Sequence, residues 1–276
     1  MTDFDHFLLT RFNARQGPAR AGDGWLRHRL ELFEDLCLPS VRAQSSDSFR
    51  WLVFFDSERD QWFQREVDRL SEGAFEPIWV DGALTTDLIS DEVQGRSSSP
   101  WLITTRVDND DAVAKDFIER IQHEFARQDF EFINFNSGLQ LAEDGAVFRW
   151  TDLSGPFISL IEKRSVDGAP RTVHIDGHDK LTNYGNIRGL DPHPMWLQMI
   201  HGKNLANEVR GIRTSPRQLL EHFVVHRTAT PISMVSLRTA QLRNIVKLVA
   251  RVLRHPRFMR RAVSILRSRI LGQWRE

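Results

Sequence analysis

The feature that most constrains this chain is an apolar run that ends abruptly in carboxylates. Residues 101–107 have the apolar and β-branched character of a buried strand, and Asp108, Asp110 and Asp111 follow within four residues. Apolar side chains then recur every four residues, as in a helix, at Val113, Phe117, Ile121 and Phe125. Carboxylates clustered at a buried strand end repel one another unless a cation or polar donors neutralise them. We therefore predict a divalent metal ion at this turn.

Strand-like and helix-like segments alternate along the first half of the chain. We expect strands over 6–11, 49–55, 77–80, 101–107 and 130–135. Amphipathic helices should lie between them, around 26–37 and 63–70. Asp23 is expected to cap the first helix and Pro39 to end it, and residues 87–99, which run into the Gly/Ser-rich stretch 95–100, are expected to form a flexible connection. This alternation predicts an α/β fold, Rossmann-like, with a mostly parallel sheet covered by helices on both faces.

Polar side chains fall where the predicted strands end. Arg11 and Asn13 follow the first strand, Asp56 the second, and Arg106 precedes the acidic cluster. Ligands of open parallel sheets bind beyond the carboxyl ends of the strands. We therefore expect one cleft that gathers these side chains.

The second half has a different pattern. Residues 138–142 and 147–151 flank a turn and predict a hairpin, and further strands are expected over 157–162, 172–175 and 195–201. Residues 183–194 are rich in Gly, Asn and Pro, which suggests a mobile loop over the cleft. From Ser236 onward the spacing is helical, broken at Pro256, and predicts a basic amphipathic helical hairpin.

The formal net charge of zero hides an asymmetry. Residues 238–276 hold eleven Lys and Arg and one acid, so residues 1–237 carry a net charge of −10. We expect a catalytic domain over 1–237 and a basic extension over 238–276. The extension could bind an anionic membrane surface, contact nucleic acid, or fold back on the acidic body. Nucleic acid is the weakest of these because no aromatic stacking platform accompanies the arginines.

The cysteine content and the N-terminal sequence bear on the cellular compartment. The single cysteine, Cys37, excludes an intrachain disulfide and fits a reducing environment as a core thiol. The N-terminus lacks a signal-peptide pattern, and no apolar run reaches the roughly 20 residues that span a bilayer. We expect a cytoplasmic protein, peripheral at the inner face of the membrane if the tail binds lipid.

The Asp108-Asn-Asp110 triplet has the form of a D-x-D metal motif. Oxygen ligands of this kind suit Mn²⁺ or Mg²⁺, although aspartates at a helix start also stabilise the macrodipole without any metal. His201 ends an apolar strand and is a candidate metal or phosphate ligand, with Lys203 beside it as a phosphate partner. Asp179 and Asp176 are candidate general bases, although both also suit polar turns.

A series of motifs runs through Arg11-Phe-Asn, Leu32-Phe-Glu, Leu38-Pro-Ser-Val, Gln44, residues 49–56, residues 105–111, Trp196-Leu-Gln, His201-Gly and Asn204. In this order the motifs resemble the rhamnosyltransferase family, whose members are GT-A-type glycosyltransferases. The resemblance covers roughly residues 5–210 and leaves the basic tail outside.

The resemblance implies a nucleotide-sugar donor, a divalent cation on its diphosphate, and sugar transfer to a hydroxyl acceptor, as in surface polysaccharide synthesis. By position, Asp110 would be the principal metal ligand, Asp108 would contact the metal or the donor ribose, and His201 would complete the site. Asp179, Asp176 and Asp111 are the candidates for the base that deprotonates the acceptor. Arg11 and Asp56 would line the nucleotide pocket.

Two other functions stay open at this point. The same fold could serve as a catalytically silent scaffold that binds carbohydrate or membrane, which would show no metal-dependent nucleotide binding. It could also be a metal-dependent phosphohydrolase, which would release phosphate from simple esters without an acceptor.

Overall fold

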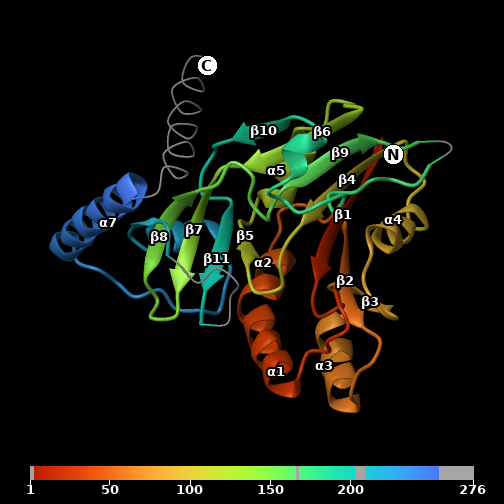
Figure 1. Cartoon of the computed structure of the whole chain (residues 1–276), viewed down its shortest axis with the longest axis horizontal. Helices are drawn as coiled ribbons and strands as arrows, with labels where there is room; N and C mark the ends of the chain where they lie inside the picture. The colour runs from red at the N-terminus through yellow and green to blue at the C-terminus, as the bar shows by residue number, and fades with distance from the viewer. Residues whose placement is uncertain (1–2, 166–167, 203–208, 255–276) are drawn as a thin grey trace.

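The structure is a computed structural model that describes residues 3–165, 168–202 and 209–254 (Figure 1). Its centre is a seven-stranded sheet in the order β10-β6-β9-β4-β1-β2-β3. The strands of this sheet are β1 (Phe4–Arg11), β2 (Arg50–Asp56), β3 (Glu76–Val80), β4 (Trp101–Arg106), β6 (Phe130–Phe135), β9 (Ser159–Lys163) and β10 (Ile187–Leu190). Strands β4, β1, β2 and β3 are parallel neighbours, whereas β9 runs antiparallel to both β4 and β6. The predicted α/β fold with a mostly parallel sheet is confirmed.

Strand β1 lies in the middle of the sheet and is buried on both faces. Phe7, Leu8 and Leu9 are each fully buried, which explains why the strand reads as a continuous apolar run rather than an alternating one. Leu8 packs in a large cluster with apolar residues of α1, α3 and α5, and Phe7 and Leu9 pack with those of α4. Helices therefore cover both faces, as the sequence predicted.

The helices are α1 (Asp23–Leu32), η1 (Phe33–Cys37), α2 (Leu38–Arg42), α3 (Gln61–Ser71), α4 (Thr86–Gln94) and α5 (Phe117–His123). Two expectations for the first helix are wrong. Gly22 is its N-cap and Asp23 lies in the first turn. Pro39 does not end the helix, because the π-helical turn η1 shifts the chain so that Pro39 falls in the first turn of α2, where its missing N–H is tolerated.

Two further boundaries differ from the prediction. Helix α4 precedes the connection at residues 95–100, with the Thr85 side chain accepting from the backbone N–H of Leu88 at its start. The predicted helix after the acidic cluster begins only at Phe117, because Val113 belongs to the short strand β5 (Ala112–Val113). Apolar residues still recur every four positions because β5 and α5 bury their side chains in the same core.

A second, five-stranded sheet, ordered β12-β8-β7-β11-β5, was not predicted. Besides β5 it contains β7 (Ser137–Ala142), β8 (Val147–Thr151), β11 (Trp196–Ile200) and β12 (Ile212–Arg213). The predicted hairpin is its β7–β8 pair, with Gly145 at φ +79° in the turn. Gly138 makes room for the Trp196 ring on the neighbouring strand, since a Cβ there would lie 2.0 Å from Trp196 Cδ2.

Two segments of the second half fold differently from the prediction. Residues 172–175 form no strand, and Thr172 adopts a positive φ of 57°. The predicted loop over 183–194 contains the end of a short helix, η2 (Leu181–Asn183), and the edge strand β10, which pairs with β6. The backbone hydrogen bonds of the sheet edge therefore order part of this segment.

The chain continues through α6 (Arg217–His222) into α7 (Met234–Arg254), which Figure 1 shows at the outer edge of the five-stranded sheet. The predicted domain boundary after Leu237 falls inside α7. This helix is joined to β12, where Asn244 Oδ1 accepts from the N–H of Arg213 at 3.1 Å and Gln241 Nε2 donates to the Arg213 carbonyl at 3.1 Å. The second helix of the predicted hairpin lies outside the described residues. Within the described part, every helix is too short or too polar to cross a bilayer.

Candidate active site

The acidic stretch forms the turn between β4 of the large sheet and β5 of the small one. Asn109 fastens it to the first, since its Nδ2 donates to the carbonyl of Phe12, just beyond β1, at 2.7 Å. Asp111 fastens it to the second, since its Oδ1 accepts the backbone N–H of Met199 in β11 at 2.9 Å. Asp108 and Asp110 are therefore presented from a turn that is anchored at two points.

Two of the three predicted metal ligands, Asp110 and His201, meet in the structure, whereas Asp108 pairs with Arg106 instead. His201, which directly follows β11, places Nε2 3.0 Å from Asp110 Oδ2, and both residues are buried. The two are 91 positions apart in sequence and reach each other because β11 pairs with β5, which directly follows the acidic stretch. The predicted pairing of Asp110 with His201 is thus present in the geometry.

Arg29 of α1 also reaches this point, and sequence reasoning missed it. Its Nη1 lies 2.5 Å from Asp110 Oδ2 and donates to Asn109 Oδ1 at 3.0 Å. The position of Arg29 in the helical pattern could have identified it. Arg29 stands three residues after Leu26 and four before Phe33, so a charged side chain falls within the apolar stripe of an otherwise amphipathic helix.

Asp108 sits in a second cationic environment, on the side of β1 and β4. Arg106 Nη2 pairs with Asp108 Oδ1 at 3.0 Å. Burial alone would raise the pKa of Asp108, but the charges of Arg106 and Arg11 outweigh it and the pKa falls below its usual value. His174, also absent from the predicted site, lies near the same three residues, and burial lowers its pKa to about 3. The predicted residues Arg11, Arg106 and Asp108 therefore belong to one cluster.

Asp111 differs from its neighbours. Burial raises its pKa well above the usual range, and repulsion from Asp110 and Asp108 adds to the effect, partly offset by the Met199 N–H. Three guanidinium groups, those of Arg11, Arg29 and Arg106, surround this part of the acidic stretch. Guanidinium groups bind phosphate oxygens in bidentate geometry, so these groups suit a diphosphate.

The end of β2 carries the third polar cluster. Asp56 is 1% exposed and pairs with Arg15, whose Nε lies 3.1 Å from Asp56 Oδ2. Asn13 Oδ1 accepts the Asp56 N–H at 3.2 Å, and Asp56 Oδ1 accepts the Glu58 N–H at 3.1 Å. Asp56 and Asn13 thus brace the loops after β1 and β2, and the partly exposed Arg15 is a further polar group at this edge.

The remaining predicted residues make contacts of their own or lie outside the described residues. Asp176 accepts from the Tyr184 hydroxyl at 3.1 Å and from the Gly177 N–H at 2.7 Å. Asp179 is exposed on the same loop. Among the described residues, no hydrogen bond or ion pair joins either aspartate to Asp108 or Asp110. Lys203 lies outside the described residues, and the assignment of the general base stays a prediction.

The residues at Asp110 fit a cation of a particular kind. Within residues 3–165, 168–202 and 209–254 no group of three or more His, Cys, Asp or Glu side chains is arranged to hold a metal ion alone. The Asp110–His201 pair supplies two ligands that meet at 3.0 Å. Mg²⁺ and similar ions are commonly bound by one or two protein ligands and substrate phosphates, with water completing the shell. The pair therefore fits a metal that arrives with a diphosphate.

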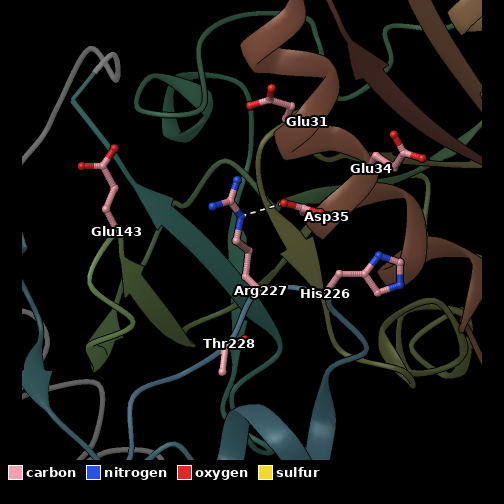
Figure 2. A pocket seen from close by; sticks show the side chains of 7 residues that line it. All are labelled: Glu31, Glu34, Asp35, Glu143, His226, Arg227 and Thr228. Carbon is pink, nitrogen blue, oxygen red and sulfur yellow. Dashed lines mark ion pairs between the residues drawn. The ribbon is translucent and has the colours of Figure 1, made fainter.

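A cavity of about 490 Å³ lies elsewhere on α1, and it is unsuited to the donor. Figure 2 shows its lining, in which Glu31, Glu34, Asp35 and Glu143 outnumber the basic Arg227, whose Nε pairs with Asp35 Oδ2 at 2.8 Å. Four carboxylates would repel a nucleoside diphosphate. The donor is better matched by the strand ends around Asp108 and Asp110.

Comparison with solved structures found distant likenesses. Residues 1–349 of S. aureus TarS in complex with UDP share 12% identity at a TM-score of 0.42, covering 79% of this chain and 62% of that one. HddC from Yersinia pseudotuberculosis shares 10% identity at a TM-score of 0.38, covering 70% of this chain and 92% of that one. This chain thus spans less than two thirds of the TarS segment.

A nucleotide-diphospho-sugar transferase from Desulfovibrio desulfuricans G20, described as putative, shares 8% identity at a TM-score of 0.37, covering 72% of this chain and 81% of that one. No curated protein matches the sequence. The family described as "Putative rhamnosyl transferase" matches residues 10–213, which include the end of β1, the acidic stretch and His201. The chain belongs to this family of glycosyltransferases.

Proposed function

We propose that this glycosyltransferase moves a sugar, rhamnose as the family description indicates, from a nucleoside-diphosphate donor to a hydroxyl of a growing surface polysaccharide. The observation that carries the proposal is the meeting of Asp110 and His201 at 3.0 Å, with Arg11 and Arg106 around the nearby Asp108. It combines a carboxylate and an imidazole, both able to bind a metal, with phosphate-binding groups at the carboxyl end of a mostly parallel sheet.

In the proposed reaction, the acceptor oxygen forms a bond to the anomeric carbon, and the bond from that carbon to the diphosphate oxygen breaks. The leaving nucleoside diphosphate keeps the electron pair. Arg11 and Arg106 would bind its oxygens as their charge grows. Asp110 and His201 would hold a Mn²⁺ or Mg²⁺ ion, which supplies Lewis-acid neutralisation of that charge.

The nucleoside would extend from the diphosphate toward the loops after β1 and β2. Asp56 lies there, buried and paired with the partly exposed Arg15, and Asn13 accepts a hydrogen bond from the Asp56 backbone. The proton of the acceptor hydroxyl must pass to a base. Asp179 and Asp176 remain the first candidates, because Oδ1 of Asp111 is already engaged by the Met199 N–H inside the protein.

The experiment measures nucleoside-diphosphate release with a panel of nucleotide sugars, including activated rhamnose, in the presence of Mn²⁺ and a glycan acceptor. Asp110→Asn should lower kcat/KM by at least roughly 100-fold, because one electrostatic contact to a leaving group is typically worth that much. Asp91→Asn changes an exposed aspartate of α4, which covers the opposite face of the sheet, and should retain full activity. Full activity of Asp110→Asn, or activity unchanged by EDTA, would reject the mechanism.

We also propose that the C-terminal segment binds an anionic membrane surface. Leu242, Ile245 and Val246 of α7 are 64%, 44% and 60% exposed, and Arg238 and Arg243 lie on the same helix. Exposed apolar side chains among arginines suit the interface of an anionic bilayer. The double variant Arg238→Glu/Arg243→Glu leaves Asn244 in place and should abolish co-sedimentation with phosphatidylserine vesicles. Equal co-sedimentation of variant and wild type would reject this proposal.

A further inference from the structure

Arg29 occupies a place that the proposed function reserves for a metal. Its Nη1 lies 2.5 Å from Asp110 Oδ2, the same oxygen that faces His201 Nε2 at 3.0 Å. The side chain of Arg29 is 12% exposed and that of Asp110 is 11% exposed. Solvent screens the pair weakly at this depth, so the guanidinium is a strong competitor for any cation at this oxygen.

The surroundings of Arg29 hold the guanidinium in place but leave it incompletely bonded. Nη1 also donates to Asn109 Oδ1 at 3.0 Å, and the Trp25 ring centroid lies 5.0 Å from the Arg29 Cζ. The buried Nε of Arg29 has no hydrogen-bond acceptor among the described residues. A buried donor without a partner is costly, and a phosphate oxygen that approached it would remove that cost.

We infer that Arg29 is a resident cation that makes metal binding depend on the donor. Without the donor, the guanidinium neutralises Asp110 and competes with the metal for Oδ2. A nucleoside diphosphate offers Arg29 other oxygens, including a partner for Nε, and so releases Asp110 to the metal. This inference rests on the proposed function, since it assumes that Asp110 binds the metal, and it assigns Arg29 as a positioning residue that couples the two ligands.

The effect of Arg29 on metal affinity can be estimated in direction and size. Metal and guanidinium exclude each other on Oδ2, so a contact that favours the guanidinium weakens metal binding by the same factor. Hydrogen bonds to charged groups typically correspond to a change of roughly tenfold to 100-fold in affinity. The free protein should therefore bind the metal about tenfold or more weakly than a variant that lacks the guanidinium, as long as no donor is present.

The experiment is a titration of Mn²⁺ alone, followed by the electron paramagnetic resonance signal of the unbound ion. Wild type, Arg29→Gln, Arg29→Lys and Arg27→Gln are compared with and without a nucleoside diphosphate, taken in turn from UDP, GDP and dTDP. Arg27 is the matched control, because it lies on the same helix with its guanidinium 4.0 Å from the Trp62 ring centroid. Its removal takes the same charge from α1 without touching Asp110.

We expect Arg29→Gln to bind Mn²⁺ about tenfold or more tightly than wild type when no nucleotide is present. The nucleotide should then add less to its Mn²⁺ affinity than it adds for wild type. Arg29→Lys keeps a positive charge, so its Mn²⁺ affinity should stay nearer to that of wild type. Arg27→Gln should have the Mn²⁺ affinity of wild type. Loss of folding cannot imitate this result, because an unfolded variant would lose the site instead of gaining affinity.

Two outcomes would overturn the inference, and they can be told apart. If nucleotide strengthens Mn²⁺ binding in wild type but Arg29→Gln binds free Mn²⁺ no better, Arg29 is not the competitor and the proposed metal site stands. If neither protein binds Mn²⁺ with any of the nucleotides, the proposed metal site itself fails and the inference fails with it.

Discussion

The buried imidazole of His6 makes the stability of the folded protein depend on pH. His6 lies on β1 and is 2% exposed, with Nε2 2.8 Å from Thr105 Oγ1, which in turn lies 2.6 Å from Ser159 Oγ. Gln122 Nε2 approaches Nδ1 at 3.4 Å, and since an amide nitrogen only donates, Nδ1 acts as an acceptor. The ring is therefore neutral, and burial lowers its pKa from 6.5 to about 3.

The sign of the pH effect follows from the two pKa values. In the unfolded chain His6 takes up a proton near pH 6.5, whereas in the folded protein it stays neutral down to about pH 3. The unfolded state thus binds more protons in this window, and stability falls as the pH falls. Each pH unit below 6.5 costs about 1.4 kcal/mol, so between pH 7.5 and 5 this residue removes roughly 2 kcal/mol from the free energy of unfolding.

Urea denaturation at pH 7.5 and 5 measures this directly when wild type is compared with His6→Gln. The variant loses stability at both pH values, but its loss between them should be about 2 kcal/mol smaller than that of wild type. His123→Gln removes an exposed histidine from α5 and serves as the control, with the wild-type pH dependence. Equal pH dependence in wild type and His6→Gln would refute the reasoning, because other titrating groups are common to both proteins.

The other predictions concern the space around three side-chain positions, one in the small sheet and two in the first helical segment. Gly138→Ala would place Cβ 2.0 Å from Trp196 Cδ2 and should cost about 3 kcal/mol in a urea denaturation, as overpacking typically does. Gly24→Ala, in α1 with no atom within 4 Å of the new Cβ, should instead be neutral or stabilise by up to about 1 kcal/mol. Phe33→Ala empties a position that is 1% exposed and should lower stability by about 3–5 kcal/mol, and a loss below 1 kcal/mol would show that the core closes around it.

The large sheet could be predicted because its evidence is local. β1 and β2 are buried on both faces and appear as apolar runs with polar residues at their ends. The small sheet could not be predicted as a whole, although its hairpin could. Its strands β5 and β12 have two residues each and form only by pairing with strands that are far away in sequence. Such short strands leave no periodicity to detect, and their pairing depends on the finished tertiary structure.

The candidate site divides in the same way. Asp108, Asp110 and His201 could be found because polar side chains directly after apolar strands are conspicuous. The apolar periodicity of α1 gives no role to Arg29, and the pattern of residues 172–175 predicts a strand instead of the loop that holds His174. In both cases the residue acts through neighbours that are remote in sequence, and only the fold brings them together.

The pairing of β5 with β11 also determines which parts of the chain can be exchanged with relatives. Residues 107–113 and 195–201 are joined by the β5–β11 ladder and by the bond from the Met199 N–H to Asp111. A graft of either segment alone would pair one strand from this protein with a strand from a relative, and the contacts between them would be lost. Chimeras intended to alter donor preference should therefore transplant both segments as one unit, even though about eighty residues separate them along the sequence.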